Sequence, residues 1–385
     1  MKEIIQRFEV PFTYKVIFTQ DLFNPKNNSF AEFFASKNEL SKIYFVIDDG
    51  VLEAWPNLLQ EIELYFKAYK NELILLGEPL SVPGGEAAKN DNKHLERILK
   101  ATEEFHIDRH SYIVAIGGGA VLDMVGFAAA IAHRGIRHVR IPTTVLSQND
   151  SGIGVKNGIN AFGKKNYLGS FAPPFAVFND SLYLKTLDDR DWRSGISEAI
   201  KVALIKDLAF FEEIEAQCDM LAERDLPAME SLIYKCAELH MEHIANGDPF
   251  EMGSSRPLDF GHWAAHKMEQ LSDYKLRHGE AVAIGICLDV VYSFHKGMIS
   301  KVDLNRVINL FKNLGFKLHH PVVSQRNTEN ELKIIAGLNE FREHLGGELT
   351  IMLLEDLGKG VEVHEMEAAI IEKSVAYLEN MYVTV

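Results

Sequence analysis

Long apolar runs are missing from this sequence of 385 residues. None approaches the roughly 20 residues that a membrane-spanning helix requires. The first residues, MKEIIQRFEVPF, carry charges where a secretory signal would be apolar. Cysteine is scarce, since Cys218, Cys236 and Cys287 are widely spaced and odd in number. This pattern predicts neither a disulfide framework nor a thiolate zinc motif. We therefore expect a cytoplasmic protein with no membrane partner.

Basic residues are outnumbered, because 40 Lys and Arg against 55 Asp and Glu give a formal net charge of −15. A nucleic-acid-binding protein would favour a basic face, so we expect no nucleic-acid partner. A local basic pocket for an anionic substrate stays compatible with this balance, since net charge says little about a cleft. Internal repeats and low-complexity linkers are also missing.

The two halves of the chain differ in their hydrophobic periodicity. In the first half, short β-rich runs alternate with amphipathic stretches such as Asp91–Ile107, which predicts an α/β domain with a mostly parallel sheet. After about Leu184 helical periodicity dominates, and β-rich runs return only at ELTIMLLEDLG. We therefore predict an α/β domain over 1–184 and a mainly α-helical domain over 185–385. The expected strands are Lys42–Gly50, Glu72–Gly77, Ser111–Gly119 and His138–Thr144.

The stretch YIVAIGGGAVLD reads as a strand, three glycines and the start of a helix. Glycines there let a backbone approach a pyrophosphate, and the helix N-terminus supplies amide donors. A tight turn in any α/β protein reads the same way, and the spacing is not GxGxxG. Strand ends at IDD, PGGEAAK and IPTT add carboxylates, a lysine and hydroxyls. Because ligands collect at strand ends, a dinucleotide site is the functional hypothesis.

Two further features suggest chemistry. The polar segment Ser147–Phe171 is either a solvated surface loop or a cradle for phosphate and hydroxyl groups. In the helical half, His262 and His266 lie four residues apart and so share one helix face, but HxxxH without a Glu after the first His is not a zincin motif. A divalent ion needs about three such donors that converge in space. The candidates are Glu198, His262, His266 and His278, with His240 and His243 weaker.

The order of these motifs resembles the dehydroquinate synthase family of sugar phosphate cyclases. The motifs are PGGExxK, GGGxxxDxxGFxAA, HRGxxxxxIPTT, the segment Asp150–Asn166, SExIK, GHxxxH and HGExVA, and the resemblance covers roughly Phe45 to Leu288. It implies a carbon–oxygen lyase that uses NAD and a divalent metal, zinc or less commonly cobalt. Such an enzyme converts a linear seven-carbon sugar phosphate into a carbocycle with loss of phosphate.

The resemblance also assigns roles by position. The implied metal ligands are Glu198, His262 and His278. The implied catalytic residues are Asp150, Lys156, Lys201 and His266. Substrate contacts are implied for Arg134, Asn160, Lys165, Asn166 and Lys359, and Arg134 would reach the neighbouring subunit of a homodimer. The implied NAD contacts are Asp48, Glu86, Lys89, Gly117, Gly118, Gly119, Asp123, Thr143 and Thr144.

Three positions depart from the family pattern where a substrate carboxylate would bind. His240 replaces a lysine, Ser255 stands at the arginine position with Arg256 beside it, and Asp259 replaces an asparagine. We include His240, Arg256 and Asp259 among the expected substrate contacts. A carboxylate at Asp259 would repel a substrate carboxylate unless Arg256 or His240 compensates. These changes favour a carboxylate-free substrate such as sedoheptulose 7-phosphate, whereas the retained His266 argues for the dehydroquinate synthase substrate.

Two other functions stay open at this point. A metal-dependent polyol or glycerol-phosphate dehydrogenase would share the glycine turn and the helical metal domain, but it would consume NAD stoichiometrically. A catalytically silent, dinucleotide-binding partner protein has no physical need for Glu198, His262, His278, Lys156 and Lys201 together.

Overall fold

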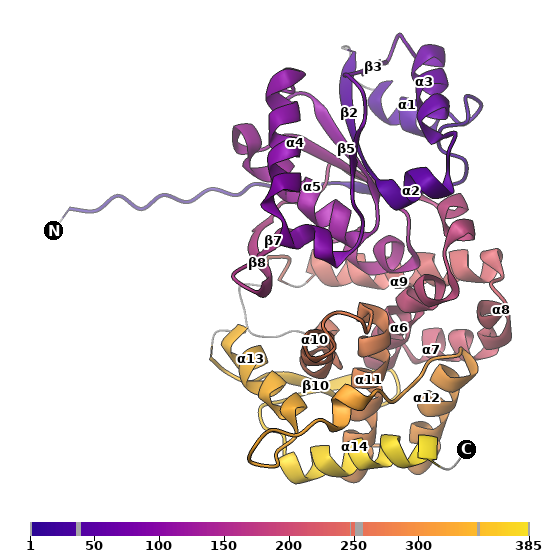
Figure 1. Cartoon of the computed structure of the whole chain (residues 1–385), viewed down its shortest axis with the longest axis vertical. Coiled ribbons are helices and arrows are strands. Elements are labelled where there is room, and N and C mark those ends of the chain that lie inside the picture. Colours follow the sequence, from indigo (N-terminus) through magenta and orange to yellow (C-terminus); the bar gives the residue numbers. More distant parts are fainter. Residues whose placement is uncertain (1, 36–39, 247, 251–256, 345–346, 384–385) are drawn as a thin grey trace. The chain divides into compact units, whose positions relative to one another are not determined.

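A parallel sheet of seven strands organises the first part of the chain in this computed structural model (Figure 1). The structure describes residues 2–35, 40–246, 248–250, 257–344 and 347–383. The strand order is β1-β9-β6-β5-β2-β3, and β4 also pairs with β2. The strands are β1 Lys15–Thr19, β2 Ser41–Asp48, β3 Leu73–Leu75, β4 Leu80–Val82, β5 Tyr112–Gly117, β6 Arg137–Pro142 and β9 Ala176–Asp180. The mostly parallel sheet expected from the sequence is confirmed.

Both faces of this sheet are covered, which explains the uninterrupted apolar run in β2. Along that strand Tyr44 and Val46 pack with side chains of α4 and α5, whereas Phe45 points into an aromatic cluster with α1 and α3. Asp91 caps α4 by accepting a hydrogen bond from the Lys93 amide, so the helix begins where its pattern predicts. The helices are α1 Ser29–Ala35, α2 Asp49–Ala54, α3 Leu58–Ala68, α4 Asn92–Glu104 and α5 Gly119–Ile131.

The segment Ser147–Phe171 is more ordered than a surface loop. A π-helical turn over Ser147–Ser151 is followed by an antiparallel hairpin of β7 Lys156–Ala161 and β8 Lys164–Phe171. Gly158 and Gly169 face each other in this hairpin, and a Cβ on either one would lie within 3 Å of the opposite strand's backbone. The polar composition that suggested a solvated loop is therefore that of a hairpin in which β8 is largely exposed and residues 157–160 of β7 are buried. Its paired glycines allow the two strands to approach closely.

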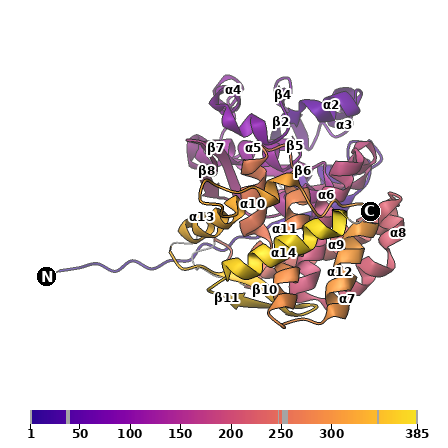
Figure 2. The same ribbon diagram turned by 60° about the horizontal axis from the view of Figure 1, so that its bottom comes forward.

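The second part of the chain is mainly helical, as expected. Helices α6 and α11 are buried along most of their length, and α14 packs across α11 (Figure 2). The helices are α6 Asp189–Lys206, α7 Leu208–Ala216, α8 Cys218–Ala222, α9 Leu226–Asn246, α10 His262–Leu271, α11 His278–His295, α12 Lys301–Asn313, α13 Ala336–His344 and α14 Ala368–Val383. Strands β10 Ile351–Asp356 and β11 Lys359–Val363 form a two-stranded sheet at the expected β-rich run.

The chain divides into two units that are discontinuous in sequence. The sheet unit comprises Met1–Thr143 and Gly152–Asp180, and the helical unit comprises Thr144–Ser151 and Ser181–Val385. The π-helical turn therefore belongs to the helical unit, although it lies between β6 and β7 in the sequence. Along the described residues no helix combines the length and apolar character needed to cross a membrane. The three cysteines are buried and unpaired with one another.

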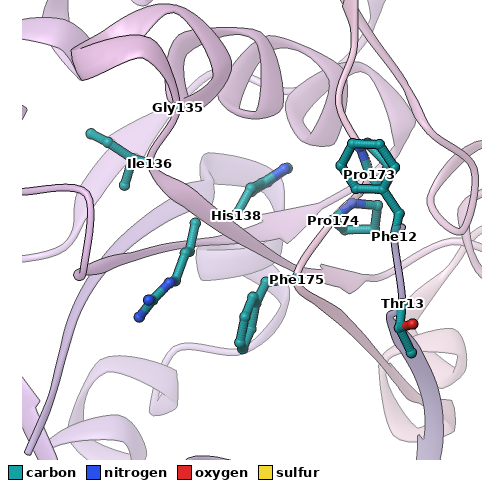
Figure 3. A pocket seen from close by; sticks show the side chains of 9 residues that line it. Phe12, Thr13, Gly135, Ile136, His138, Pro173, Pro174 and Phe175 are labelled. Carbon is teal, nitrogen blue, oxygen red and sulfur yellow. The ribbon is translucent and has the colours of Figure 1, made fainter. Parts of the chain in front are cut away.

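One cavity of about 210 Å³ lies at the amino end of β6 (Figure 3). Its lining comes from the sheet unit and includes Phe12, Ile136, His138 and Phe175. The imidazole of His138 is buried and has no hydrogen-bond partner on either nitrogen among the described residues. Burial lowers the pKa of His138 well below its ordinary value, with a smaller contribution from Arg140. The ring is therefore neutral in the folded protein.

Candidate active site

Three donor side chains converge within the helical unit. Glu198 lies in the middle of α6, and His262 and His278 are the first residues of α10 and α11. The Nε2 atoms of His262 and His278 lie 3.6 and 3.5 Å from Oε1 of Glu198. One ligand atom from each residue lies within 4.8 Å of the other two. The structure thus brings together the three residues expected to bind a metal.

The hydrogen bonds of the two histidines prepare them as ligands. Nδ1 of His262 donates to the carbonyl of Phe260 at 3.1 Å, and Nδ1 of His278 donates to Oε2 of Glu269 at 3.0 Å. With the proton on Nδ1, the lone pair of each Nε2 points at the shared centre. Burial, and then the charge of Lys201, lowers the pKa of His262, which keeps the ring neutral as a metal ligand must be.

The spacing of the donors suits a divalent ion. Donors about 2.1 Å from a tetrahedral ion lie about 3.4 Å apart, close to the two separations seen here. Neither oxygen of buried Glu198 forms a hydrogen bond within the described part of the chain, although Lys201 forms an ion pair with it. A buried carboxylate with unused lone pairs is costly unless a cation occupies the site. The donor set of two imidazoles and one carboxylate fits zinc or a similar ion.

The start of α10 is fixed by close packing against α11. Gly261 has a φ of 78°, and a Cβ there would lie 2.5 Å from the Ile286 amide nitrogen. Buried Asp289 on α11 accepts hydrogen bonds from the Gly261 amide and from Nε1 of Trp263, both at 2.9 Å. These bonds flank His262 on both sides and so orient it. Burial raises the pKa of Asp289 to about 7, although both hydrogen bonds oppose the rise.

Glu269 and Asp289 are functional candidates that the sequence reasoning missed. The signal for Asp289 was a lone carboxylate inside the apolar run AVAIGICLDVVY. Such a group needs a partner when it is buried. Glu269 lies seven residues after His262, so its position on the same helix as that histidine was readable, but its contact with His278 is set by the tertiary structure.

A second set of charges surrounds the donor cluster. Nδ1 of His240 lies 3.0 Å from Oδ1 of Asp150. Burial and Glu198 would raise the pKa of Asp150, but Lys201 and His240 hold it below its ordinary value. Burial would lower the pKa of Lys201, yet Glu198 and Asp150 raise it above the usual lysine value. The site therefore contains an ionised carboxylate beside a lysine whose charged form these carboxylates favour.

The other histidines and the predicted substrate residues are placed as follows. His266 is exposed, and its ring stacks on that of His278 with 5.9 Å between centroids. His266 also forms a second possible donor group with Glu269 and His278, and among the described residues His240 and His243 belong to neither group. Burial together with Lys206 lowers the pKa of His243 to about 4. Asp259 is half-buried, and its charge acts on Lys201 and on His262.

Lys359, an expected substrate residue, pairs outside this cluster. It is exposed at the start of β11, and its ammonium forms an ion pair with Glu355 at 2.8 Å. Arg256, also expected to contact the substrate, and the neighbouring Ser255 lie outside the described residues.

In the sheet unit, the expected nucleotide residues gather after the parallel strands. Gly117 ends β5, Gly118 caps α5 and Gly119 is its first residue. The amide of Thr143 donates to the Gly117 carbonyl at 3.0 Å. The carboxylate of Asp48 accepts a hydrogen bond from the Gly50 amide, and a Cβ on Gly84 would lie 2.5 Å from it. Burial raises the pKa of Asp48.

Lys89 is the centre of a buried network in the same unit. Its ammonium bonds Oδ2 of Asp123 at 2.9 Å, contacts Oδ1 of Asn166 and lies 3.7 Å from Oε1 of Glu86. Asn160 donates to Glu86 at 3.0 Å and accepts from the Asn166 amide at 2.8 Å. Burial raises the pKa of Asp123 although Lys89 opposes the rise. The expected NAD residues are thereby linked to two expected substrate residues.

The remaining candidates are exposed or half-buried. Lys156 is exposed at the start of β7, and Lys165 is half-buried on β8. Arg134 lies in an exposed turn in which His133, Arg134 and Gly135 all have positive φ. Thr144 belongs to the helical unit and bonds Ser147 through both backbone and hydroxyl.

A glycine turn on a parallel sheet, together with a His–His–Glu donor set on helices, defines the class of α/β enzymes with a helical metal domain. Residues 79–194 match the model of the 3-dehydroquinate synthase N-terminal family, and residues 195–337 match that of the 3-dehydroquinate synthase C-terminal family. A 3-dehydroquinate synthase of Nitrosospira multiformis is 36% identical over 312 residues, which are 80% of this chain and 83% of that one. The chain belongs to the 3-dehydroquinate synthase family.

Solved structures of related cyclases have the same fold. A 2-epi-5-epi-valiolone synthase from Streptomyces hygroscopicus, with NAD⁺ and Zn²⁺ bound, is 28% identical with a TM-score of 0.86, and the match covers 98% of this chain and 99% of that one. A 2-deoxy-scyllo-inosose synthase complexed with carbaglucose-6-phosphate, NAD⁺ and Co²⁺ is 21% identical with a TM-score of 0.74, over 94% of this chain and 95% of that one. The second likeness is one of fold alone.

Proposed function

We propose that this protein is a sugar phosphate cyclase that uses NAD and a divalent metal ion, zinc or cobalt. It converts a linear seven-carbon sugar phosphate into a carbocycle and releases phosphate. The observation that carries the proposal is the convergence of Glu198, His262 and His278 beside Lys201, since this donor set fits a divalent ion. The family supports it, as does a relative with NAD⁺ and Zn²⁺ bound.

The bound groups would supply two kinds of chemistry. NAD would accept a hydride from a ring hydroxyl and later return it, and the ion held by Glu198, His262 and His278 would polarise substrate oxygens as a Lewis acid. Asp48, Glu86, Lys89, Asp123, Thr143, Thr144 and the glycines Gly117, Gly118 and Gly119 are the proposed NAD contacts.

The chain's own residues would hold charge and move protons. Glu198 and Asp150 raise the pKa of Lys201, so its ammonium would stabilise a negative oxygen. Asp150 is ionised and paired with His240, and this pair can accept a proton at the imidazole while the carboxylate orients the ring. Lys156 and Lys165 would bind the phosphate as cations, with Asn160 and Asn166 contacting neutral oxygens. His266, Arg256, Asp259 and Lys359 stay proposals as substrate contacts.

Charge around the donor cluster favours a substrate without a carboxylate. Asp150, Glu198 and Asp259 contribute three negative groups, and Lys201 contributes the one lysine that acts on all of them. A divalent ion brings this set to about neutral, so no excess positive charge is left for a substrate carboxylate. His240, which stands where the family has a lysine, is already paired with Asp150. We therefore propose sedoheptulose 7-phosphate, or a similar carboxylate-free sugar phosphate, as the substrate.

The alternative substrate is the heptulosonate 7-phosphate of 3-dehydroquinate synthases, which the 36% identity to such an enzyme favours. A phosphate-release assay with NAD⁺ and Zn²⁺ or Co²⁺ separates the two. Release from sedoheptulose 7-phosphate alone supports the proposal, and release from the heptulosonate alone corrects the substrate. NADH that accumulates with no phosphate would refute the cyclase and indicate a polyol dehydrogenase.

We further propose a cytoplasmic homodimer in which Arg134 contributes to the partner's site. The exposure of Arg134 supports this proposal, because an exposed side chain in a turn can reach a neighbouring subunit. Light scattering measures the mass, and mixing Arg134→Ala with Glu198→Ala should restore activity in mixed dimers. A monomeric mass, or no restored activity on mixing, would contradict the proposal.

A further inference from the structure

Arg140 in the middle of β6 is fully buried. Its guanidinium forms no ion pair with a carboxylate of the described chain, and its hydrogen bonds go to uncharged oxygens. Nη1 donates to the carbonyls of Gly152 at 3.0 Å and Gly154 at 2.8 Å. Nη2 donates to the carbonyl of Lys156 at 3.0 Å and to Oδ1 of Asn157 at 2.7 Å. An apolar side chain of similar volume would fill this space without the desolvation cost of a buried charge.

The hydrogen bonds of Arg140 satisfy alternate backbone carbonyls of one segment, 152–156. The carbonyls of residues 152, 154 and 156 converge on the guanidinium. The carbonyl of Ile153 accepts from the Tyr14 hydroxyl at 2.8 Å, and that of Val155 accepts from the Ala172 amide at 2.9 Å. All five carbonyls are thus satisfied, although no strand pairing covers the segment before Lys156.

The side chain of Asn157 holds the end of this segment through hydrogen bonds at both of its polar atoms. Its Oδ1 accepts from Arg140, and its Nδ2 donates to the carbonyl of Ala172 at 3.0 Å. The room for this side chain comes from Gly126 on α5, where a Cβ would lie 1.8 Å from Oδ1 of Asn157. The fork-shaped guanidinium, with its donors in one plane, suits several carbonyls at once better than an ammonium does.

We propose that Arg140 is the positioning residue for Lys156. Lysine has a long flexible stem, so the location of its ammonium depends on how firmly its backbone is held. Arg140 bonds the Lys156 carbonyl directly, together with the carbonyls of Gly152 and Gly154 before it and the side chain of Asn157 after it. The proposal rests on the role assigned to Lys156 in the proposed function. It adds that this role depends on the guanidinium of Arg140, a buried side chain of β6.

The test compares Arg140→Met and Arg140→Lys with Arg137→Met in the full-length protein. Arg137 is a matched control on the same strand, because its hydrogen bonds go to the His110 carbonyl and the Tyr112 hydroxyl and not to residues 152–157. Hydrogen exchange of residues 152–161 is measured without substrate, so it decides the structural part of the proposal even if the protein proves not to be a cyclase. If Arg140→Met does not fold, Arg140→Lys carries the test.

Arg140→Met is expected to raise exchange in residues 152–161 at least tenfold, with Arg140→Lys between it and wild type and Arg137→Met unchanged. In the phosphate-release assay Arg140→Met should lower kcat/KM at least tenfold, with the split between kcat and KM that Lys156→Met shows. Unchanged exchange in the segment overturns the proposal. So does an activity loss whose kcat and KM pattern differs from that of Lys156→Met, since this indicates a general structural role.

Discussion

Glu269 gives the sharpest test of the proposed metal cluster, because its carboxylate bonds Nδ1 of His278, the ring nitrogen that faces away from Glu198. Its carboxylate is almost fully buried and accepts the Nδ1 proton of His278 at 3.0 Å. Loss of such a partner typically weakens metal binding 10- to 100-fold, or about 1.4 to 2.7 kcal/mol. Glu269→Gln keeps an acceptor and loses the charge, so we expect a loss near tenfold. Glu269→Ala loses both, so we expect a loss near a hundredfold.

The assay is titration of metal-free protein with Co²⁺, followed by its visible absorption, and competition for Zn²⁺ with a chelator of known affinity. Glu340→Gln is the control, because Glu340 is exposed and pairs with Lys267, and the substitution changes net charge by the same amount. Metal affinities of both Glu269 variants within twofold of wild type would refute the reasoning, as would an equal loss in Glu340→Gln. Thermal melting of the metal-free proteins separates loss of affinity from loss of folding.

Four further outcomes are expected. His278→Ala should abolish metal-dependent phosphate release while circular dichroism stays that of a folded protein, and full activity would refute the ligand assignment. Asp289→Ala leaves two buried N–H donors without acceptors, so urea denaturation should show a loss of about 2 to 6 kcal/mol, and a loss under 1 kcal/mol would contradict the packing described. Gly126→Ala places a methyl group against the Asn157 side chain, and the same measurement should show a loss of about 1 to 3 kcal/mol, whereas no loss would mean that the side chain moves freely. Burial depresses the pKa of His138, so its neutral form stabilises the fold above the unfolded pKa and this stability is lost as pH falls. Between pH 7.5 and 5.5 the free energy of unfolding of the wild type should fall by about 1.4 kcal/mol more than that of His138→Asn. Equal pH dependence in both proteins would disprove the assignment.

Most of the fold was readable from periodicity. Strands β2, β5 and β6 lie where buried apolar runs were expected, because strands covered on both faces leave uninterrupted hydrophobic sequence. The hairpin of β7 and β8 was missed for the opposite reason. Its sequence is rich in glycine, asparagine and lysine, which are depleted in strands, and pairing between the two strands outweighs that preference.

The metal cluster was predicted from motif order and not from spacing. Their spacing of four residues suggested that His262 and His266 act together, because they share a helix face. In the structure His262 instead lies beside Glu198 and His278, which come from two other helices. Convergence of this kind depends on helix packing, which one sequence does not encode locally. The same limit explains why Glu269, Asp289 and Arg140 were not found. Their function lies in contacts with other elements, and only the lone carboxylate of Asp289 left a trace in the sequence.

The eight residues from Thr144 to Ser151 make the helical unit discontinuous in sequence, since they belong to it but lie between β6 and β7 of the sheet unit along the chain. No single cut in the gene can therefore yield both units intact. A fragment starting at residue 185 would lack Asp150, and its His240 would lose the carboxylate that holds it. Separate production of the helical unit requires this octapeptide to be grafted onto it or supplied as a peptide. For the same reason, exchange of whole domains between related cyclases must carry two breakpoints around the octapeptide as well as the one near residue 180.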